Sequence, residues 1–208
     1  NIKVISHYDT DGITSAAIFS RALQRWNKNF SIQAIKGLDK KFIETLREDQ
    51  ILIFLDLASG SLDYLKDKKN DIFIFDHHEV IQEIPKNITM INPFFDNSEQ
   101  ICSAAICYMF AKALSKNNKD LAHLALIGMV GDSHEKEIGK LYDEIIKDSE
   151  TIIKKGFLLY PSTRPIDKAL EYSSSPYIPG VTGSSTGVLE LLKEAGIQKR
   201  SNGYKALY

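Results

Sequence analysis

Hydrophobic residues in the first half of the chain alternate between short runs rich in β-branched and aromatic residues and longer stretches with one apolar face. The runs predict five strands, and the stretches between the first four predict three helices, at residues 2–6, 12–26, 30–36, 40–47, 51–55, 62–66, 72–75 and 89–91. The runs at 51–55 and 72–75 lack the polar alternation of a half-exposed strand, which favours parallel strands covered on both faces. This βαβα order predicts an α/β fold with a doubly wound, mainly parallel five-stranded sheet.

The second half of the chain shows a different pattern. Apolar residues at helical spacing predict a helical segment that begins near residue 102, and a stretch rich in proline and serine follows it. A final helix is expected at residues 186–195, where Gly196 ends it. We expect residues 1–155 to form one domain, and residues 156–208 to form a turn-rich connector and helix that lead to a C-terminal domain outside this sequence.

The charge balance narrows the classes of partner only a little. The chain has 208 residues, of which 26 are basic and 27 acidic, so its total charge favours neither nucleic acid nor a membrane, although a local basic groove is compatible with it. Cys102 and Cys107 lie in one apolar helical stretch, where they are not aligned for a disulfide, which predicts a reducing compartment. The sequence shows neither an apolar run as long as a membrane span nor a leader pattern, so we expect a cytoplasmic protein without membrane contact.

Acidic residues and histidines follow three of the predicted strands, in the region where open parallel sheets place their binding sites. They are His7, Asp9 and Asp11 after the first strand, Asp56 after the third, and Asp76, His77 and His78 after the fourth. A single acid at such a position commonly caps the next helix. Four acids that converge on one crevice repel one another unless a cation neutralises them. Carboxylate with imidazole suits manganese, while magnesium, zinc and iron are less favoured, and the pattern predicts a site for two ions.

These residues resemble the motifs of a known family. The segment His7-Tyr8-Asp9-Thr10-Asp11-Gly12, Asp56 at the end of an apolar strand, and Asp76-His77-His78 resemble the first three motifs of the DHH phosphoesterase superfamily. Asp132, which follows an apolar helical segment, resembles the fourth. Within the superfamily, residues 6–14, 36–39 and 169–183 are most similar to archaeal RecJ-like proteins, which include the GINS-associated nuclease.

The resemblance implies a role for each residue of the site. His7 and Asp9 would hold one metal ion and Asp11, His77 and Asp132 the other, with Asp56 bridging the two. His78 would then contact the scissile phosphate, and Asp76 would orient one of the imidazoles. The two divalent ions are expected to be Mn²⁺, with Mg²⁺ as the alternative.

The function implied is that of a manganese-dependent phosphodiesterase or exonuclease, which hydrolyses single-stranded nucleic acid by a two-metal mechanism. Such an enzyme serves DNA repair or replication. The expected partners are single-stranded DNA or RNA, together with GINS or other replication proteins.

Two other functions stay open. One is a non-catalytic replication scaffold similar to Cdc45, against which the intact set of acids and histidines argues. The other is hydrolysis of a small substrate such as pyrophosphate, a cyclic dinucleotide or an oligoribonucleotide. Pyrophosphatases of the superfamily separate the first histidine from the next aspartate by three residues, whereas one residue separates His7 from Asp9.

Two further histidines need an interpretation. His123 lies on a helical apolar stripe and is expected to be structural. His134 follows Asp132 by two residues. We expect it to be a surface residue, with a contact to the substrate or to a metal ligand as the alternative.

Overall fold

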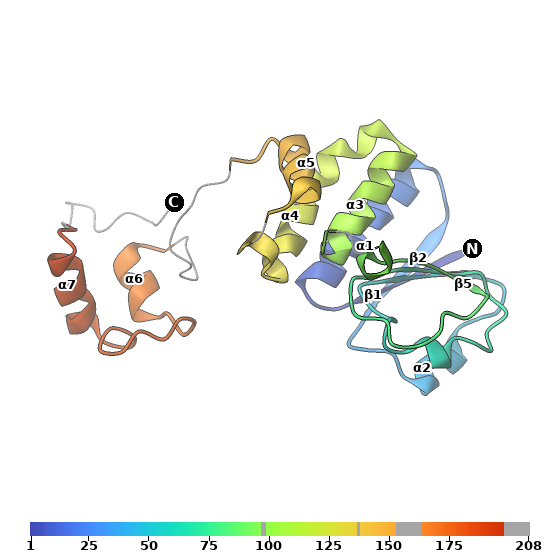
Figure 1. Cartoon of the computed structure of the whole chain (residues 1–208), viewed down its shortest axis with the longest axis horizontal. Coiled ribbons are helices and arrows are strands. Elements are labelled where there is room, and N and C mark those ends of the chain that lie inside the picture. The colour runs from blue at the N-terminus through green and yellow to red at the C-terminus, as the bar shows by residue number, and fades with distance from the viewer. Residues whose placement is uncertain (97–98, 137, 153–163, 198–208) are drawn as a thin grey trace. The chain divides into compact units, whose positions relative to one another are not determined.

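The computed structural model describes residues 1–96, 99–136, 138–152 and 164–197. The chain forms two compact units, residues 1–151 and residues 152–208, which are described separately (Figure 1). The first unit contains a sheet and the helices that cover it. The described part of the second contains helices α6 and α7. The predicted role of residues 156–208 as a connector to a further domain stays a prediction.

The sheet has five strands and is parallel throughout, which confirms the predicted fold class. The strands are β1 (Ile2–His7), β2 (Phe30–Ile35), β3 (Ile51–Leu55), β4 (Ile72–Phe75) and β5 (Ile88–Ile91). Their order is β2-β1-β3-β4-β5, and each neighbouring pair is parallel. The apolar β3 and β4 lie inside the sheet, whereas β2 forms an edge and exposes Ser31 and Gln33. The pattern of polar residues thus follows the position of each strand in the sheet.

Helices cover both faces of the sheet, as a doubly wound fold requires (Figure 1). One face carries α1 (Thr10–Arg25), α3 (Ser103–Leu114), α4 (Ala122–Gly131) and α5 (Lys140–Ser149). Their apolar residues form one core with Val4, Ile53 and Phe75 of the sheet. The other face carries α2 (Lys40–Thr45) and the 3₁₀ helix η1 (Leu62–Tyr64), which form a second core with Ile5 and Phe54. Val4 and Ile5 are adjacent in β1 and point to opposite faces, so the sheet is buried on both sides.

The predicted helix at residues 62–66 is wrong in kind, because the segment forms only the single 3₁₀ turn η1. Leu62 and Leu65 are buried as the pattern indicated. The backbone bonds here run over three residues, from the Leu65 N–H to the Leu62 carbonyl and from the Lys68 N–H to the Leu65 carbonyl. The side-chain amide of Asn87 also donates to the carbonyls of Leu65 and Lys68, at 3.2 and 2.9 Å. Further 3₁₀ helices in the described residues are η2 (Pro93–Asp96), η3 (Lys116–Leu121) and η4 (His134–Lys136).

The second unit has a small core of its own. Its helices are α6 (Ile166–Glu171) and α7 (Ser185–Glu194), and its buried residues are Leu170, Val181, Val188 and Leu192. The bounds of α7 lie within one residue of the predicted helix. Gly196 follows it with φ of 69°, and the Ile197 N–H donates to the Leu192 carbonyl at 2.8 Å, as in a glycine-terminated helix. Residues 160–163, which belong to the expected turn-rich connector, lie outside the described residues.

Cys102 and Cys107 are both buried and free. Within the described ranges, no helix combines the length and the apolar character that a membrane span needs.

Gly128 of α4 determines how closely the helices of the first unit approach one another. A Cβ atom at this position would lie 2.5 Å from Cβ of Ala104 in α3 and 2.6 Å from Oδ1 of Asp11 in α1. Both neighbours are fully buried, so neither can move aside without disturbing the core. The close packing of α1, α3 and α4 therefore depends on glycine here.

We expect Gly128→Ala to lower the free energy of unfolding by about 1–3 kcal/mol, the usual cost of overpacking a core. Gly37→Ala is the matched control, because no atom lies within 4 Å of a Cβ built at this exposed position. The control should stay within about 0.5 kcal/mol of the native protein. Urea denaturation of both variants measures the difference, and equal stabilities would contradict the proposed steric role.

Candidate metal centre

The candidate site lies where the direction of the chain changes at the sheet. In the order β2-β1-β3-β4-β5, the chain leaves β1 toward α1 on one face and leaves β3 toward η1 on the other. In open α/β sheets, ligands bind beside the carboxyl ends of two neighbouring strands at such a change of direction. Ser6 of β1 pairs with Leu55 of β3, so His7 and Asp56 follow at adjacent positions of this edge.

His7, Asp9 and Asp56 form the first ligand group, in which each residue offers one nitrogen or oxygen atom within 4.8 Å of the others. Asp9 caps α1, because its Oδ1 accepts the Gly12 N–H at 2.9 Å. Its Oδ2 is left to face His7 Nδ1 at 2.7 Å. His7 Nδ1 also lies 3.5 Å from Oδ2 of Asp56. One carboxylate thus serves both the helix and the site.

Asp56 connects the two halves of the site. It is buried and has φ of 60°, a left-handed conformation that aspartate adopts more readily than most residues. Its Oδ1 accepts the Ser103 hydroxyl at 3.1 Å and lies 3.5 Å from Nε2 of His77. Because Oδ2 faces His7, the two oxygens of this carboxylate face different histidines. Strained backbone of this kind often occurs at functional sites.

His77, Asp132 and His134 form the second ligand group, by the same distance criterion. Asp132 terminates α4, and its Oδ2 lies 3.0 Å from Nε2 of His77. The ring of His134 is 5.7 Å from that of His77, edge to face. Asp56 and His77 also form a third group with His78, which joins the two ligand groups into one continuous site.

Asp11 is placed differently from the other predicted ligands. It is fully buried, and its two oxygens accept the backbone N–H groups of Ser103 and Ala104, at 2.7 and 2.9 Å. These groups begin α3, whose own N-cap, Cys102, makes no side-chain capping bond. Asp11 therefore caps a helix that lies far away in the sequence. Its Oδ2 is 4.0 Å from Nε2 of His77, but Asp11 belongs to none of the three groups, and its role as a ligand stays a prediction.

Asp76 belongs to none of the three ligand groups; instead, its carboxylate contacts the ring of His78. Its Oδ1 lies 2.7 Å from Nδ1 of His78, and its Oδ2 accepts the backbone N–H and the hydroxyl of Ser59 at 3.0 and 2.6 Å. The His78 side chain is 58% exposed, so its other ring nitrogen is free to meet a ligand. The Asn92 amide donates to the His78 carbonyl at 2.8 Å and fixes the backbone beneath the ring.

Crowding of the carboxylates shifts the pKa values of the site. Burial, reinforced by the charges of Asp56 and Asp132, raises the pKa of Asp11 to about 7. Burial also raises the pKa of Asp56. It opposes protonation of His77, but the carboxylates of Asp132 and Asp56 outweigh it and raise the pKa of this imidazole to about 10. The metal-free site thus binds protons where a metal ion would otherwise supply the positive charge.

The arrangement of the donor atoms suits binding to divalent ions better than hydrogen bonding among the side chains. His7 Nδ1 and His77 Nε2 are buried and make no well-aligned hydrogen bond, although carboxylate oxygens lie 2.7 and 3.0 Å away. Ligand atoms that share one ion have this separation, because bonds of about 2.0 to 2.6 Å at right angles place neighbouring donors about 3 Å apart. The mixed set of carboxylate and imidazole donors suits Mn²⁺, whereas Mg²⁺ prefers oxygen donors. The structure brings His7, Asp9, Asp56, His77, His78 and Asp132 together around this arrangement.

The two remaining histidines differ from expectation. His123 does not lie on the apolar side of α4 but is exposed, with its Nδ1 2.6 Å from the Asp120 carbonyl, because the buried stripe passes through the neighbouring positions. His134 is not an ordinary surface residue, since it is partly buried against His77 and Tyr142. Its spacing from Asp132 was the only signal in the sequence, and it did not reveal the contact with Tyr142.

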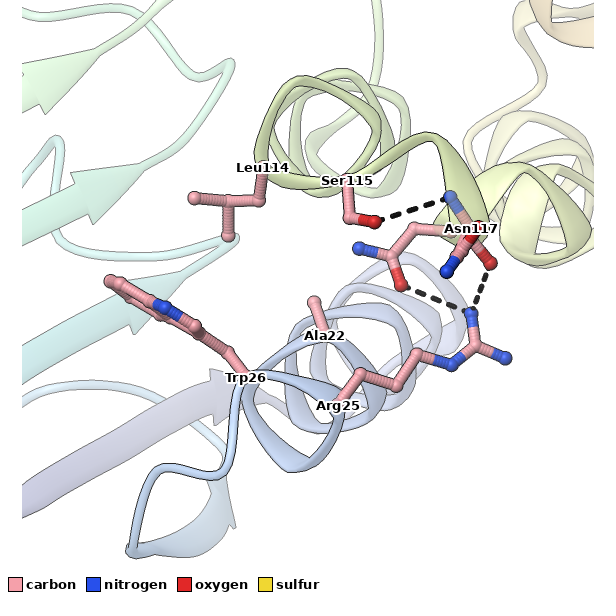
Figure 2. A pocket seen from close by; sticks show the side chains of 7 residues that line it. Ala22, Arg25, Trp26, Leu114, Ser115 and Asn117 are labelled. Atoms are coloured by element: carbon pink, nitrogen blue, oxygen red, sulfur yellow. Dashed lines mark hydrogen bonds between the residues drawn. The ribbon is translucent and has the colours of Figure 1, made fainter.

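A separate pocket of about 580 Å³ lies at the other end of α1, between Trp26 and Leu114 (Figure 2). Its polar wall is already paired. Arg25 donates to the Asn117 carbonyl, to Asn118 and to Asp120. The pocket contains no histidine or acid among its lining residues, so it offers no metal ligands.

The family of the chain follows from its N-terminal part. Residues 1–129 match the model of the DHH family, N-terminal domain. The chain belongs to the DHH family. Residues 159–206 also match the model of the DHH-CID domain. The DHH motif itself is Asp76-His77-His78, which this structure places at the carboxyl end of β4.

Relatives and solved structures agree with this DHH assignment. An uncharacterized protein of Methanocaldococcus jannaschii is 31% identical over 94% of the chain, and the chain spans about half of its length, 48%. Exonuclease RecJ bound to manganese has a similar fold, with a TM-score of 0.62, 18% identity and coverage of 90% of this chain and 49% of that one. Cdc45 from Entamoeba histolytica gives a TM-score of 0.67, 18% identity and coverage of 99% and 49%. At such identities these structures establish the fold alone.

Asp56→Asn should weaken manganese binding both at the first ligand group and beside His77 in this DHH site, while preserving the fold. Asparagine tolerates the left-handed backbone and can retain the bond to Ser103, but it removes the charge that faces both histidines. Calorimetric titration with MnCl₂ should show two ions per native chain and strongly reduced affinity in the variant. A thermal shift gives a second measure, because an ion at 100 times its Kd stabilises by about 2.7 kcal/mol.

The exposed Asp67 provides the control for this experiment, since Asp67→Ala removes an acid of the same charge outside the ligand groups. It should bind manganese as the native chain does. Loss of only one ion in Asp56→Asn would assign Asp56 to one ligand group and contradict its bridging position.

The metal-free protein should lose stability as the pH rises from about 5 to about 9. The pKa of Asp11 is about 7 in the fold against 3.8 for an unperturbed aspartate, and that of His77 about 10 against 6.5 for an unperturbed histidine. In both cases the folded chain binds more protons in this range, so the unfolding free energy decreases with rising pH. Urea denaturation in EDTA measures it, and His77→Gln should flatten the upper part of the curve. A rise in stability over this range would contradict the assignment.

Proposed function

We propose that this chain carries the metal centre of a manganese-dependent phosphodiesterase that hydrolyses single-stranded nucleic acid. The observation that supports this most strongly is the sharing of Asp56 between two sets of ligand atoms, the first ligand group and the group that contains His77. Paired ions that share a carboxylate suit in-line displacement at phosphorus.

The residues divide into metal-holding and substrate-facing sets. His7 and Asp9 would hold one ion, and His77 and Asp132 the other. Asp56 would hold both ions. Asp11, whose Oδ2 lies 4.0 Å from Nε2 of His77, would be a further ligand of the second ion. When bound, the two ions supply an activated water and positive charge for the phosphoryl oxygens, which is the chemistry that phosphodiester hydrolysis needs. Mg²⁺ is the alternative to Mn²⁺ for the same oxygen and imidazole donors.

His78 supplies the hydrogen-bond donor from the chain itself. Its bond to Asp76 raises the pKa of the imidazole, which favours a protonated ring. With Nδ1 directed to Asp76, Nε2–H is left to donate to a phosphoryl oxygen as negative charge builds there. Asp76 stays ionised and so keeps its hold on the ring. Burial opposes its charge, but the bonds from His78 and Ser59 hold the pKa of this carboxyl below its usual value.

A protein nucleophile is not part of the proposal. Burial raises the pKa of the Cys102 thiol and of the Cys107 thiol, so both stay protonated near neutral pH. The hydroxyl of Ser59 is occupied by Asp76. Water is therefore the attacking group.

The substrate class rests on relatives rather than on the site. The fold is similar to that of exonuclease RecJ, and the resemblance of the motifs to archaeal RecJ-like nucleases supports a single-stranded polynucleotide, DNA or RNA, as the substrate. The likeness in fold to Cdc45 keeps a non-catalytic scaffold as the second candidate, and GINS or other replication proteins stay the partners that the motif resemblance implies. A scaffold has no need for buried imidazole nitrogens that face carboxylates without hydrogen bonds, and this observation favours the enzyme.

A substrate panel tests the proposal. End-labelled single-stranded DNA and RNA, pyrophosphate and a cyclic dinucleotide are incubated with the chain and Mn²⁺, Mg²⁺ or EDTA. We expect manganese-dependent hydrolysis of a single-stranded polynucleotide. Hydrolysis of pyrophosphate or the dinucleotide alone would replace the substrate class, and absence of hydrolysis with two manganese ions bound would favour the scaffold.

His78→Ala should separate catalysis from metal binding. Removal of a donor that acts on the developing charge should lower turnover by about 100-fold or more, while two manganese ions remain bound. His123→Ala is the matched control, because His123 is an exposed histidine of the same unit outside the ligand groups. Turnover and calorimetric stoichiometry are measured on both variants. Loss of one ion in His78→Ala would reassign His78 as a ligand.

A further inference from the structure

His134 is brought into the site by a sharp change of chain direction after α4. Asp132 ends the helix, and Ser133 follows with φ of 59°, in the left-handed region. The chain therefore turns back on itself, and His134 at the start of η4 faces His77 with the ring centroids 5.7 Å apart. The turn places two residues of one short segment beside the same imidazole.

A buried tyrosine holds the ring of His134. Tyr142 of α5 is fully buried, and its hydroxyl accepts the Cys102 N–H at 2.8 Å and lies 3.1 Å from Nδ1 of His134. Its ring meets that of His134 edge to face, at 6.0 Å. The imidazole is thus held by Tyr142 of α5, whose hydroxyl is in turn held by the Cys102 N–H just before α3. Imidazoles that bind metal ions are usually oriented in this way through the second ring nitrogen.

His134 lies where it can add a third ligand atom to His77 and Asp132. Nε2 of His77 is buried without a well-aligned hydrogen bond and lies 3.0 Å from Oδ2 of Asp132. His134 offers a nitrogen within 4.8 Å of both ligand atoms. His77, Asp132 and the shared Asp56 would give this ion one imidazole and two carboxylates, and His134 would add a second imidazole.

We propose that His134 binds the same divalent ion as His77 and Asp132, with Tyr142 as the residue that orients it. This inference rests on the proposed function, because it concerns one of its two ions. A neutral imidazole that binds through Nε2 carries its proton on Nδ1, and that proton donates to the Tyr142 hydroxyl. The hydroxyl oxygen then accepts from both Cys102 N–H and His134, which uses its two lone pairs.

The experiment measures manganese itself rather than turnover alone. Native chain, His134→Ala, His134→Asn and His134→Gln are titrated with MnCl₂, and unbound Mn²⁺ is counted by its electron paramagnetic resonance signal. Asparagine keeps a polar group near Nδ1 for the bond to Tyr142 but has no atom at Nε2, whereas glutamine reaches the Nε2 position. His123→Ala is the control for loss of an exposed histidine of α4. Thermal denaturation in EDTA shows that each variant is folded.

We expect two bound ions in the native chain and in His123→Ala. One of the two should bind at least about tenfold more weakly in His134→Ala and His134→Asn, the scale on which even outer hydrogen-bond partners of metal ligands act. His134→Gln should recover part of the affinity. Tyr142→Phe, which removes the partner of Nδ1, should weaken the same ion and leave the other unchanged.

Two results would overturn the inference. If His134→Ala binds both ions with native affinity while the native chain also binds two, His134 is not a ligand and the proposed function still stands. If the native chain binds no manganese, the proposed function fails first and the assignment of His134 fails with it. A loss of turnover in His134→Ala with both ions bound at native affinity belongs to the first result, since His134 would then act on the substrate.

Discussion

The first unit depends on how the fold accommodates buried carboxylates that meet at one edge of a parallel sheet. Asp11, Asp56 and Asp76 are all buried, and like charges in a medium of low dielectric constant oppose folding. Each has a different compensating partner. Asp76 binds the Ser59 N–H and hydroxyl and the ring of His78, and Asp11 binds the first N–H groups of α3. Only Asp56 is left with imidazoles as its main neighbours.

This distribution separates structural from chemical roles among residues that look alike. Asp11 uses both oxygens to cap α3, and Asp9 uses one of its oxygens to cap α1. The remaining oxygen of Asp9, together with oxygens of Asp56 and Asp132, faces histidine nitrogens that make no well-aligned hydrogen bond. A carboxylate at a strand end can thus cap a helix and line a metal centre at once. The two interpretations of such residues are compatible because the two oxygens point in different directions.

The sequence predicted the strands well, because each depends on a local pattern. Ile51–Leu55 and Ile72–Phe75 agree with the predicted runs residue for residue, since continuous apolar runs are typical of strands covered on both faces. The prediction of a helix at residues 62–66 was wrong, because the backbone bonds of this segment run over three residues and form a single 3₁₀ turn. The prediction for His123 was wrong because helical spacing alone does not show which side of α4 meets the core.

By itself the sequence determined the fold class and the order of the acids and histidines along the chain. The carboxyl ends of parallel strands meet at one edge of the sheet, so residues that follow different strands necessarily converge there. Only the tertiary structure decided which atoms remain available there. The bond from Asp11 to α3 spans 92 residues, and His134 owes its position to Tyr142, which packs from α5. Such contacts depend on how helices pack across the sheet, and no local pattern encodes that packing.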